Sequence, residues 1–535
     1  MTTEPEAADP LFEGPSEKER KYDRQLRLWA ASGQAALESA KLLLVNSGAG
    51  TAGTEVLKNL ILPGIGSFTI ADDAYVDQAD LGVNFFVDSS WLGKSRAECC
   101  CRMLLELNPE VKGDWYPKKK SPLYLEQLLD SSATEPFAVV VYVLPLPVER
   151  LNLIKGYARK NNAALVALHS VGFYAYFRIS LPGIFPIVDT HPDESSISDL
   201  RLLDPWPELL SYAAKLTKNM DNLSDHDHGH LPLVAILIHY LSHWRDSHGH
   251  ANPTSYSDKV AFRRLVADSM RRDNGEGGEE NFEEAVSAVM KHVTLSTVPS
   301  SLQQVFDYSE KMRQGHSNSD FWIIAKAVRQ FYDIHKQLPF PGVLPDMKAE
   351  SEVYVNLQKI FRTKAFQDSN EVLALVLAIP GGENVDPDNV DLFCANSRFI
   401  KLINTVGPNE VQLQDVVARE LENDQMAATA GIEAPTSLIP IYLGLEALSH
   451  VGAATEDEIL SSMVRRAPTL ADYPRATQVA QELSRTAGAE LHNISAIIGG
   501  MVAQEIIKVV TKQYTPVDDT CIFDGIESRC QVLRL

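Results

Sequence analysis

Residues 42–72, LLLVNSGAGTAGTEVLKNLILPGIGSFTIAD, contain the pattern that decides the fold. The stretch opens with a short apolar run, which is long enough for one buried strand. Glycines follow this run in GxGxxG spacing, at Gly48, Gly50 and Gly53. The apolar residues after them recur at helical spacing, and a second β-rich run then ends at Asp72. The order of strand, glycine turn, helix and strand predicts a βαβ unit of the nucleotide-binding type.

The glycine turn of this unit has the chemistry to bind a phosphate group. Glycines let the backbone approach a ligand closely, and the N-terminus of the following helix offers free N–H groups and a positive dipole. An acidic residue about 20 positions further on, here Asp72, would bind a ribose hydroxyl. Gly48, Gly50, Gly53 and Asp72 are therefore candidate nucleotide-binding residues. The alternative is that the turn is retained only as part of the scaffold.

The composition argues against two classes of partner, nucleic acid and membranes. The chain has 535 residues, with 49 Lys and Arg against 71 Asp and Glu, and a net charge of −22. An acidic chain is a poor candidate for binding nucleic acid. The first residues contain no apolar signal segment, and no uninterrupted apolar run reaches the roughly 18 residues that would span a bilayer. We therefore expect neither nucleic acid nor a membrane as a partner.

The order of the predicted elements divides the chain into successive segments. Residues 1–17 are acidic and predict a disordered tail. Strands alternate with helices over residues 18–180, which predicts the first part of an α/β domain with a parallel sheet, and residues 181–207 form a crossover segment. Residues 208–480 show mostly helical spacing and predict a large helical insertion. The α/β pattern returns in residues 481–535, which we expect to complete the first domain.

The helix predicted for this last segment carries two adjacent glycines, Gly499 and Gly500, in its middle. Each costs about 1 kcal/mol relative to alanine in a helix interior. We therefore expect them where the helix packs closely against another backbone.

Histidines and cysteines offer two further places for chemistry. A histidine-rich run, DHDHGH at residues 225–230, is followed by His239 and His243 at helical spacing. The segment HYLSH lacks the Glu of the HExxH zinc motif, so we predict a solvated loop followed by an amphipathic helix rather than a metal site. Cys394 lies beside apolar residues without a nearby His or Lys, which predicts a buried structural thiol rather than a nucleophile.

Long motifs at both ends of the chain carry a family resemblance. KYDRQLRLW at residues 21–29, GTEVLKNLILPGIGSFTI at 53–70 and AELHNISAIIGGMVAQEIIKVVTKQY at 489–514 resemble the ubiquitin-activating enzyme family. Within it the chain is similar to the regulatory, non-catalytic subunits of the heterodimeric neddylation activators, over nearly all of residues 20–535. The resemblance implies a Rossmann-like adenylation domain of the ThiF/MoeB type, interrupted by a helical insertion that resembles a catalytic-cysteine-type domain.

The chain departs from the pattern that the resemblance implies for catalytically active members. Residues 80–84 read Asp-Leu-Gly-Val-Asn where active members have Asn-Leu-Asn-Arg-Gln, so Val83 replaces a phosphate-binding Arg. Arg96 stands in place of a Lys, and no Asp occurs in residues 139–148 to help hold magnesium. We therefore expect the glycine turn and Asp72 to be vestigial, with no cofactor, no metal and no thioester-forming cysteine in this chain.

The resemblance also assigns a role to Arg24 of the KYDRQLRLW motif. In relatives, the Arg of this Tyr-x-Arg-Gln motif reaches from the inactive half of the heterodimer to the ATP of the active half. By the same resemblance, ATP and Mg²⁺ are bound by the catalytic subunit, which adenylates the C-terminus of a ubiquitin-like modifier and forms a thioester. From the residues alone, a Tyr-Asp-Arg-Gln cluster more often serves packing and salt bridging.

The implied partners are this catalytic subunit and the modifier, in the cytoplasm, the nucleus or both. Candidate contact segments combine turn residues, proline and exposed apolar groups: Gly64 to Asp77, Pro207 to Pro232 and Gln337 to Met347. Three alternatives stay open, namely a self-sufficient adenylating enzyme, the regulatory subunit of a SUMO-activating enzyme and a dinucleotide-dependent oxidoreductase. For the oxidoreductase, the glycine fingerprint alone offers support.

Overall fold

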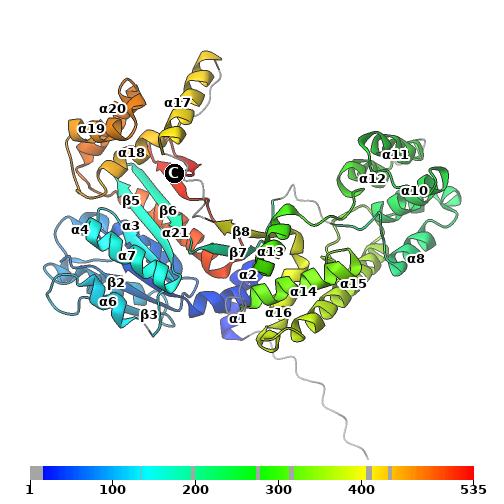
Figure 1. Cartoon of the computed structure of the whole chain (residues 1–535), viewed down its shortest axis with the longest axis horizontal. Helices are drawn as coiled ribbons and strands as arrows, with labels where there is room; N and C mark the ends of the chain where they lie inside the picture. Colours follow the sequence, from blue (N-terminus) through cyan, green and yellow to red (C-terminus); the bar gives the residue numbers. More distant parts are fainter. Residues whose placement is uncertain are drawn as a thin grey trace, which may run out of the picture. The chain divides into compact units, whose positions relative to one another are not determined.

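The structure is a computed structural model that describes residues 16–132, 134–193, 199–272, 278–311, 319–404, 413–431 and 436–535. The chain forms two compact units, one of Met1–Ile187 with Ile403–Leu535 and one of Val188–Leu402 (Figure 1). Most of the predicted acidic tail lies outside the described residues. Its last two residues, Ser16 and Glu17, instead cap and begin helix α1 (Glu17–Lys21).

The first unit is built on one mixed sheet, which confirms the predicted fold class. Its strand order is β10-β9-β6-β5-β4-β1-β2-β3, and the strands from β3 to β5 are parallel whereas β6, β9 and β10 are antiparallel. The strands are β1 (Lys41–Val45), β2 (Ser67–Ala71), β3 (Lys112–Tyr116), β4 (Val139–Val143), β5 (Ala164–Val171), β6 (Tyr174–Ser180), β9 (Thr520–Asp524) and β10 (Arg529–Leu533). The C-terminal strands therefore complete the sheet, as the sequence predicted.

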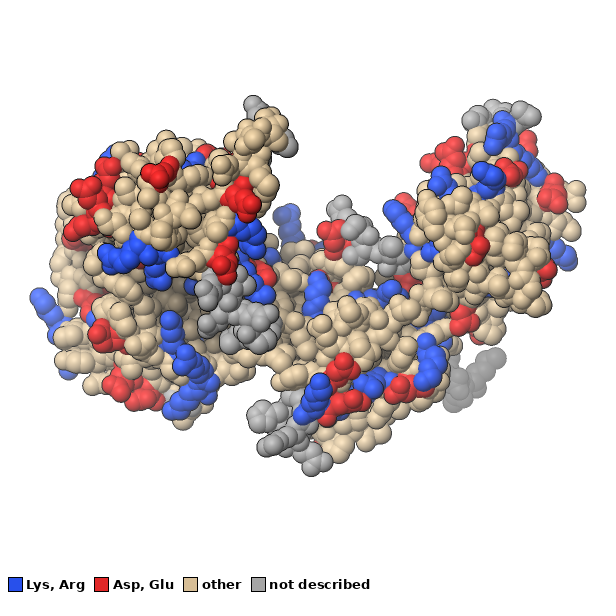
Figure 2. All heavy atoms as spheres, turned by 45° about the horizontal axis from the view of Figure 1, so that its top comes forward, with Lys and Arg blue, Asp and Glu red and all other residues tan. Residues whose placement is uncertain are grey.

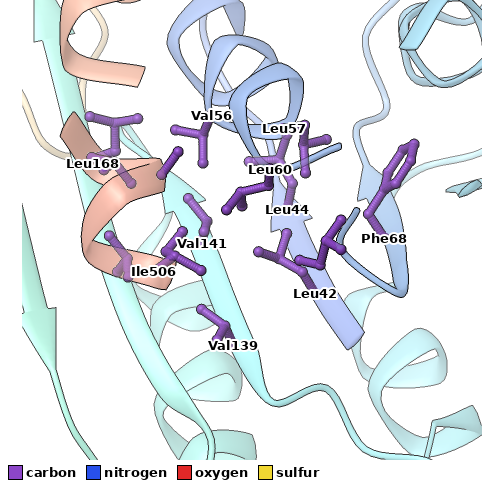
Figure 3. Packing of buried hydrophobic residues seen from close by; sticks show 14 of the residues in the cluster. Leu42, Leu44, Val56, Leu57, Leu60, Phe68, Val139, Val141, Leu168 and Ile506 are labelled. Atoms are coloured by element: carbon purple, nitrogen blue, oxygen red, sulfur yellow. The ribbon is translucent and has the colours of Figure 1, made fainter. Parts of the chain in front are cut away.

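Alternating residues of the central strands supply two cores, one on each face of the sheet. On one face Leu42 and Leu44 of β1 pack with Val56, Leu57 and Leu60 (Figure 3). Leu43 and Val45 of β1 point to the other face. The first face is covered by α2 (Asp23–Ser39), α3 (Thr51–Ile61), α5 (Arg96–Leu105) and α21 (His492–Thr511). The second is covered by α6 (Leu125–Ser131), α7 (Val148–Asn161), α18 (Ile439–Ala447), α19 (Glu456–Arg466) and α20 (Pro474–Thr486).

The insertion differs from its predicted bounds of 208–480 at both ends. The second unit begins at Val188 and ends at Leu402, so residues 403–480 belong to the first unit. The reason is packing, because Val417, Leu438 and Ile441 join the core under β4 and β5. The predicted crossover at 181–207 contains strand β7 (Ile184–Val188), which pairs with β8 (Ile400–Asn404) in a separate two-stranded sheet.

The second unit is helical and contains two cores. Its longer helices are α8 (Pro207–Leu216), α10 (Leu233–Ser247), α11 (Tyr256–Asp268), α12 (Glu280–His292), α13 (Ser300–Lys311), α14 (Asp320–His335), α15 (Ser351–Leu377) and α16 (Pro387–Ala395). Helix α15 joins the two cores, because Leu357 and Phe361 pack in one and Val372 and Val376 in the other.

Helix α21 is the most apolar long helix and packs against α3 in the first unit. By length and composition alone this helix could cross a membrane, yet 56% of its most apolar window is buried inside the structure. The expected close approach is confirmed for Gly499, where an added Cβ would lie 2.6 Å from the Cβ of Glu55 and 3.0 Å from the N of Val56. Gly500 faces open space instead, so packing does not explain it.

The two neighbouring glycines give a matched pair of substitutions. We expect Gly499→Ala to lower the melting temperature, because its methyl group would push α21 away from the backbone of α3. Gly500→Ala should leave the melting temperature unchanged or raise it, since alanine gains up to about 1 kcal/mol of helix propensity without a clash. Thermal unfolding of both variants checks this, and equal losses in the two would contradict the packing described for α21.

Candidate functional site

The glycine turn lies between β1 and α3, where the sequence predicted it, and the chain's own packing requires its glycines. Gly48 and Gly50 have φ values of +60° and +68°, a region that favours glycine. A Cβ on Gly53 would lie 2.7 Å from Oδ1 of Asn46 and 2.9 Å from Cδ1 of Leu44. These positions would therefore need glycine even if no nucleotide were bound.

Asp72, the predicted ribose ligand, is instead held by Arg96 in a two-pronged ion pair. The Nε of Arg96 donates to Oδ2 of Asp72 at 2.8 Å, and Nη2 donates to Oδ1 at 3.2 Å. The backbone N–H of Ala74 also donates to Oδ1 at 2.9 Å. Both side chains are buried, with exposures of 4% for Arg96 and 2% for Asp72. The carboxylate therefore already has a partner on each oxygen and is shielded from solvent.

The same guanidinium joins Asp72 to the glycine turn and to a second carboxylate. Its Nη1 donates to the carbonyl oxygens of Gly48 and Ala49, at 2.9 and 3.1 Å, and to Oδ1 of Asp80 at 3.1 Å. Burial by itself lowers the pKa of Arg96, but Asp72 and Asp80 outweigh it and raise the pKa. Arg96 thus stays charged and offsets part of the negative charge of these two carboxylates.

Glu490 occupies the other side of the turn, and the sequence analysis missed it. Its Oε2 accepts hydrogen bonds from the N–H of Ala52 at 2.7 Å and from the hydroxyl of Ser495 at 2.8 Å. The residue is 4% exposed. The sequence did contain one indication of its importance: Glu490 is the sole Asp, Glu, Lys or Arg between Arg485 and Glu505.

Two segments that the resemblance associates with magnesium or phosphate contain apolar residues in this chain. After β4 the chain continues with Leu144 and Leu146, both of which are buried, and residues 139–148 contain no Asp. Val83, at the end of α4 (Asp80–Val83), is half-buried and cannot bind a phosphate. Residues 139–148 and Val83 therefore contribute neither a carboxylate nor a guanidinium to the surroundings of the turn.

The KYDRQLRLW motif combines buried anchors with one exposed arginine. Tyr22 is 3% exposed, and its hydroxyl donates to Glu110 and accepts from Asn108, both at 3.1 Å. Trp29 is also buried and donates to Gln34 at 3.1 Å. Arg24 lies between these anchors on α2, is exposed, and has no ion pair or hydrogen bond with any described residue.

The histidine run differs from the predicted solvated loop. Residues Asp225–Gly229 form helix α9, and His228 is buried with its Nδ1 2.6 Å from Glu279. Among the described residues, one group has metal-ligand spacing: His226, His230 and Glu350, with ligand atoms within 4.8 Å of one another. His226 and Glu350 are exposed, and the Nδ1 of His230 is already used on the carbonyl oxygen of His226 at 2.7 Å.

The cysteine prediction is confirmed, because Cys394 is buried in the second unit. Burial raises the pKa of its thiol to about 12. Burial likewise raises the pKa of Cys99 to about 11 and those of Cys100 and Cys101 to about 12. Such thiols carry almost no thiolate at neutral pH and are not activated nucleophiles.

The three candidate contact segments differ in how much of their surface is exposed. Gly64 to Asp77 contains strand β2 inside the sheet and has Asp77 as its one exposed residue, so it offers little surface for a contact. Pro207 to Pro232 consists largely of helices and exposes Leu210, and Gln337 to Met347 exposes Val343. All three contact segments stay predictions.

Comparisons relate the chain to known proteins. Residues 22–188 match the ThiF family. A Xenopus laevis protein named "NEDD8-activating enzyme E1 regulatory subunit" is 34% identical, over 95% of this chain and 97% of that protein. A Drosophila melanogaster protein named "Nedd8-activating enzyme E1 regulatory subunit" is also 34% identical, over 97% and 98%. A crystal structure of E. coli MccB gives a TM-score of 0.27 at 20% identity, over 32% of this chain and 48% of that one.

The contacts of Arg96 predict a large effect of its removal on stability. Arg96→Met would leave Asp72 and Asp80 buried without their cation, and breaking a buried ion pair in this way costs about 3–5 kcal/mol. Arg102→Met on the same helix removes an exposed pair with Glu98 and should cost less than about 1 kcal/mol. Urea unfolding of both variants measures the difference. A loss for Arg96→Met no larger than that for Arg102→Met would contradict the role of Arg96.

Proposed function

Since this chain belongs to the family of NEDD8-activating enzyme E1 regulatory subunits, we propose that it works as the non-catalytic half of a heterodimer. Its partner in this proposal is a catalytic subunit that adenylates the C-terminus of a ubiquitin-like modifier and then forms a thioester with it. The chain by itself has no enzymatic activity, and ATP and Mg²⁺ are bound in the catalytic subunit.

One observation carries the proposal, namely the pairing of Asp72 with Arg96. In a working adenylation site the carboxylate must be free to accept a ribose hydroxyl. Here both of its oxygens accept hydrogen bonds from Arg96, and the same guanidinium spans the turn to Gly48. A nucleotide would have to break this buried pair and would gain no magnesium ligand from residues 139–148 in return.

The proposed contribution to chemistry is Arg24, supplied in trans. Its motif holds α2 in place through Tyr22 and Trp29, whereas Arg24 has no partner among the described residues that would hold it back. An always-charged guanidinium that presents several donors suits the phosphate oxygens of a nucleotide bound by another chain. Arg24 would thus stabilise charge on the partner's ATP during adenylation.

The partner surface in this proposal includes exposed apolar side chains of α2 and of the residue that follows α3. Leu28, four residues further on the same helix, is 48% exposed, and Leu62 at the end of α3 is 51% exposed. An obligate interface should exceed about 2,000 Å² and be largely apolar. Pro207 to Pro232 and Gln337 to Met347 are further candidates, for the catalytic subunit or the modifier.

Nucleic acid and membranes are not partners in this proposal, and the site of action is the cytoplasm, the nucleus or both. Figure 2 shows acidic and basic side chains interspersed over the described residues of one face, without a continuous basic track along it. Together with the net charge of −22, this mixture gives little attraction for a phosphate backbone.

ATP–pyrophosphate exchange tests the proposal and the role of Arg24 together. The purified chain alone should give no exchange, and the heterodimer with the catalytic subunit should give exchange that depends on the modifier. Arginines supplied in trans to phosphoryl-transfer sites are worth about 10³–10⁵ in rate, so Arg24→Ala should slow exchange by the heterodimer by at least about tenfold.

The control is Arg27→Ala, because Arg27 is also exposed on α2 but pairs with Asp23 at 3.1 Å. Both variants should assemble with the catalytic subunit as wild type does, as judged by size-exclusion chromatography. Exchange by the solitary chain would overturn the non-catalytic assignment, and unchanged exchange in Arg24→Ala would remove Arg24 from the chemistry.

A further inference from the structure

We propose that the carboxyl group of Glu490 takes the place of a nucleotide phosphate at the N-terminus of α3 and thereby latches together the two halves of the interrupted domain. The inference rests on the proposed function in one respect, which is that no nucleotide occupies the glycine turn. The inference goes further in that it assigns the Glu490 carboxyl group to the turn and gives this group a structural role.

The N-terminus of α3 needs an acceptor that the turn itself does not provide. Gly50 is the N-cap residue and has no side chain to cap the first N–H groups. Their partial positive charge favours an acidic group, as it favours phosphate in nucleotide-binding turns. Oε2 of Glu490 lies 2.7 Å from the N of Ala52 and so supplies the missing acceptor.

Glu490 is held in this position by its own surroundings. The hydroxyl of Ser495, one turn into α21, donates to the same oxygen at 2.8 Å. The backbone on either side is fixed at the end of β5, where the N–H of Gly172 donates to the carbonyl oxygen of Ala489 at 2.8 Å and Gly172 pairs with Glu490 in a parallel bridge. The side chain therefore points at α3 without needing a ligand to arrange it.

Glu490 and Arg96 bind different backbone groups of the same turn: Glu490 accepts from an N–H group, and Arg96 donates to carbonyl oxygens. Arg96 satisfies the carbonyl oxygens of Gly48 and Ala49, and Glu490 satisfies an N–H group two residues after Gly50. Burial raises the pKa of Glu490, whereas the hydrogen bonds from Ala52 and Ser495 and the charge of Arg96 work against that rise. The turn is thus closed on both sides by side chains of this chain.

The contact between Glu490 and Ala52 spans 438 residues, because the helical insertion lies between them. In a nucleotide-binding protein the phosphate would hold such a turn only when ligand is present. Here the acceptor comes from the C-terminal half of the same domain, so ordering the turn also fastens the two halves. A phosphate that approached α3 would meet an acidic group already in its place.

Hydrogen exchange of the full-length chain tests this latch. Glu490→Ala should accelerate exchange of the amides of residues 50–54 by at least about tenfold, because it removes a buried acceptor. Glu490→Asp, which retains the acidic group but is one methylene shorter, should also accelerate it and keeps the test valid if Glu490→Ala fails to fold. The control is Glu482→Ala. Glu482 pairs with Arg485 within α20, so its removal should leave the exchange of these amides unchanged.

Chemical rescue distinguishes an anion-like role from general loss of packing. Acetate replaces the CH₂–COO⁻ group that Glu490→Ala lacks, so sodium acetate should raise the melting temperature of this variant more than sodium chloride at equal concentration. Wild type and Glu482→Ala should show only the smaller difference that the general effect of the two salts on protein stability produces. Unaltered exchange at residues 50–54 in both Glu490 variants, or protection of these amides in wild type by added pyrophosphate, would overturn the proposal. Adenylation by the solitary chain, which would refute the proposed function, is a separate measurement.

Discussion

The buried ion pair between Arg96 and Asp72 is the interaction on which the rest of this site depends. A buried guanidinium is stable only where carboxylates and hydrogen-bond acceptors surround it, and Arg96 has Asp72, Asp80 and two backbone carbonyl groups. Asp72 is the residue that the glycine fingerprint would assign to the ribose of a nucleotide. The chain therefore keeps the βαβ architecture of a nucleotide-binding domain and uses its polar groups to hold the turn in place.

The side chains that hold this domain together are not the ones proposed to reach a partner. The buried members of the N-terminal motif, Tyr22 and Trp29, fix α2 on the domain, and their contacts do not involve Arg24. Arg96 and Glu490 satisfy carbonyl and N–H groups of the turn from within the chain. In the proposed function, surface and the Arg24 guanidinium are what the chain offers to its partner.

The sequence predicted the α/β sheet because its signal is local, as in β1 where Leu42 and Leu43 point to opposite faces. It misplaced the end of the insertion, because helical spacing is the same whether a helix packs on the sheet, as α18 does, or elsewhere. Glu490 was missed since its partner Ala52 is 438 residues away. The resemblance showed that Arg96 stands in place of a Lys, but its pairing with Asp72 could be seen only in the folded chain.

An isothermal titration of the purified chain with ATP in the presence of Mg²⁺ tests whether Arg96 keeps Asp72 from a nucleotide. We expect no saturable binding at nucleotide concentrations up to the millimolar range, in wild type and in Asp72→Asn alike. Saturable binding by the wild-type chain that is lost in Asp72→Asn would contradict this expectation, because Asp72 would then be free to bind a ribose rather than held by Arg96.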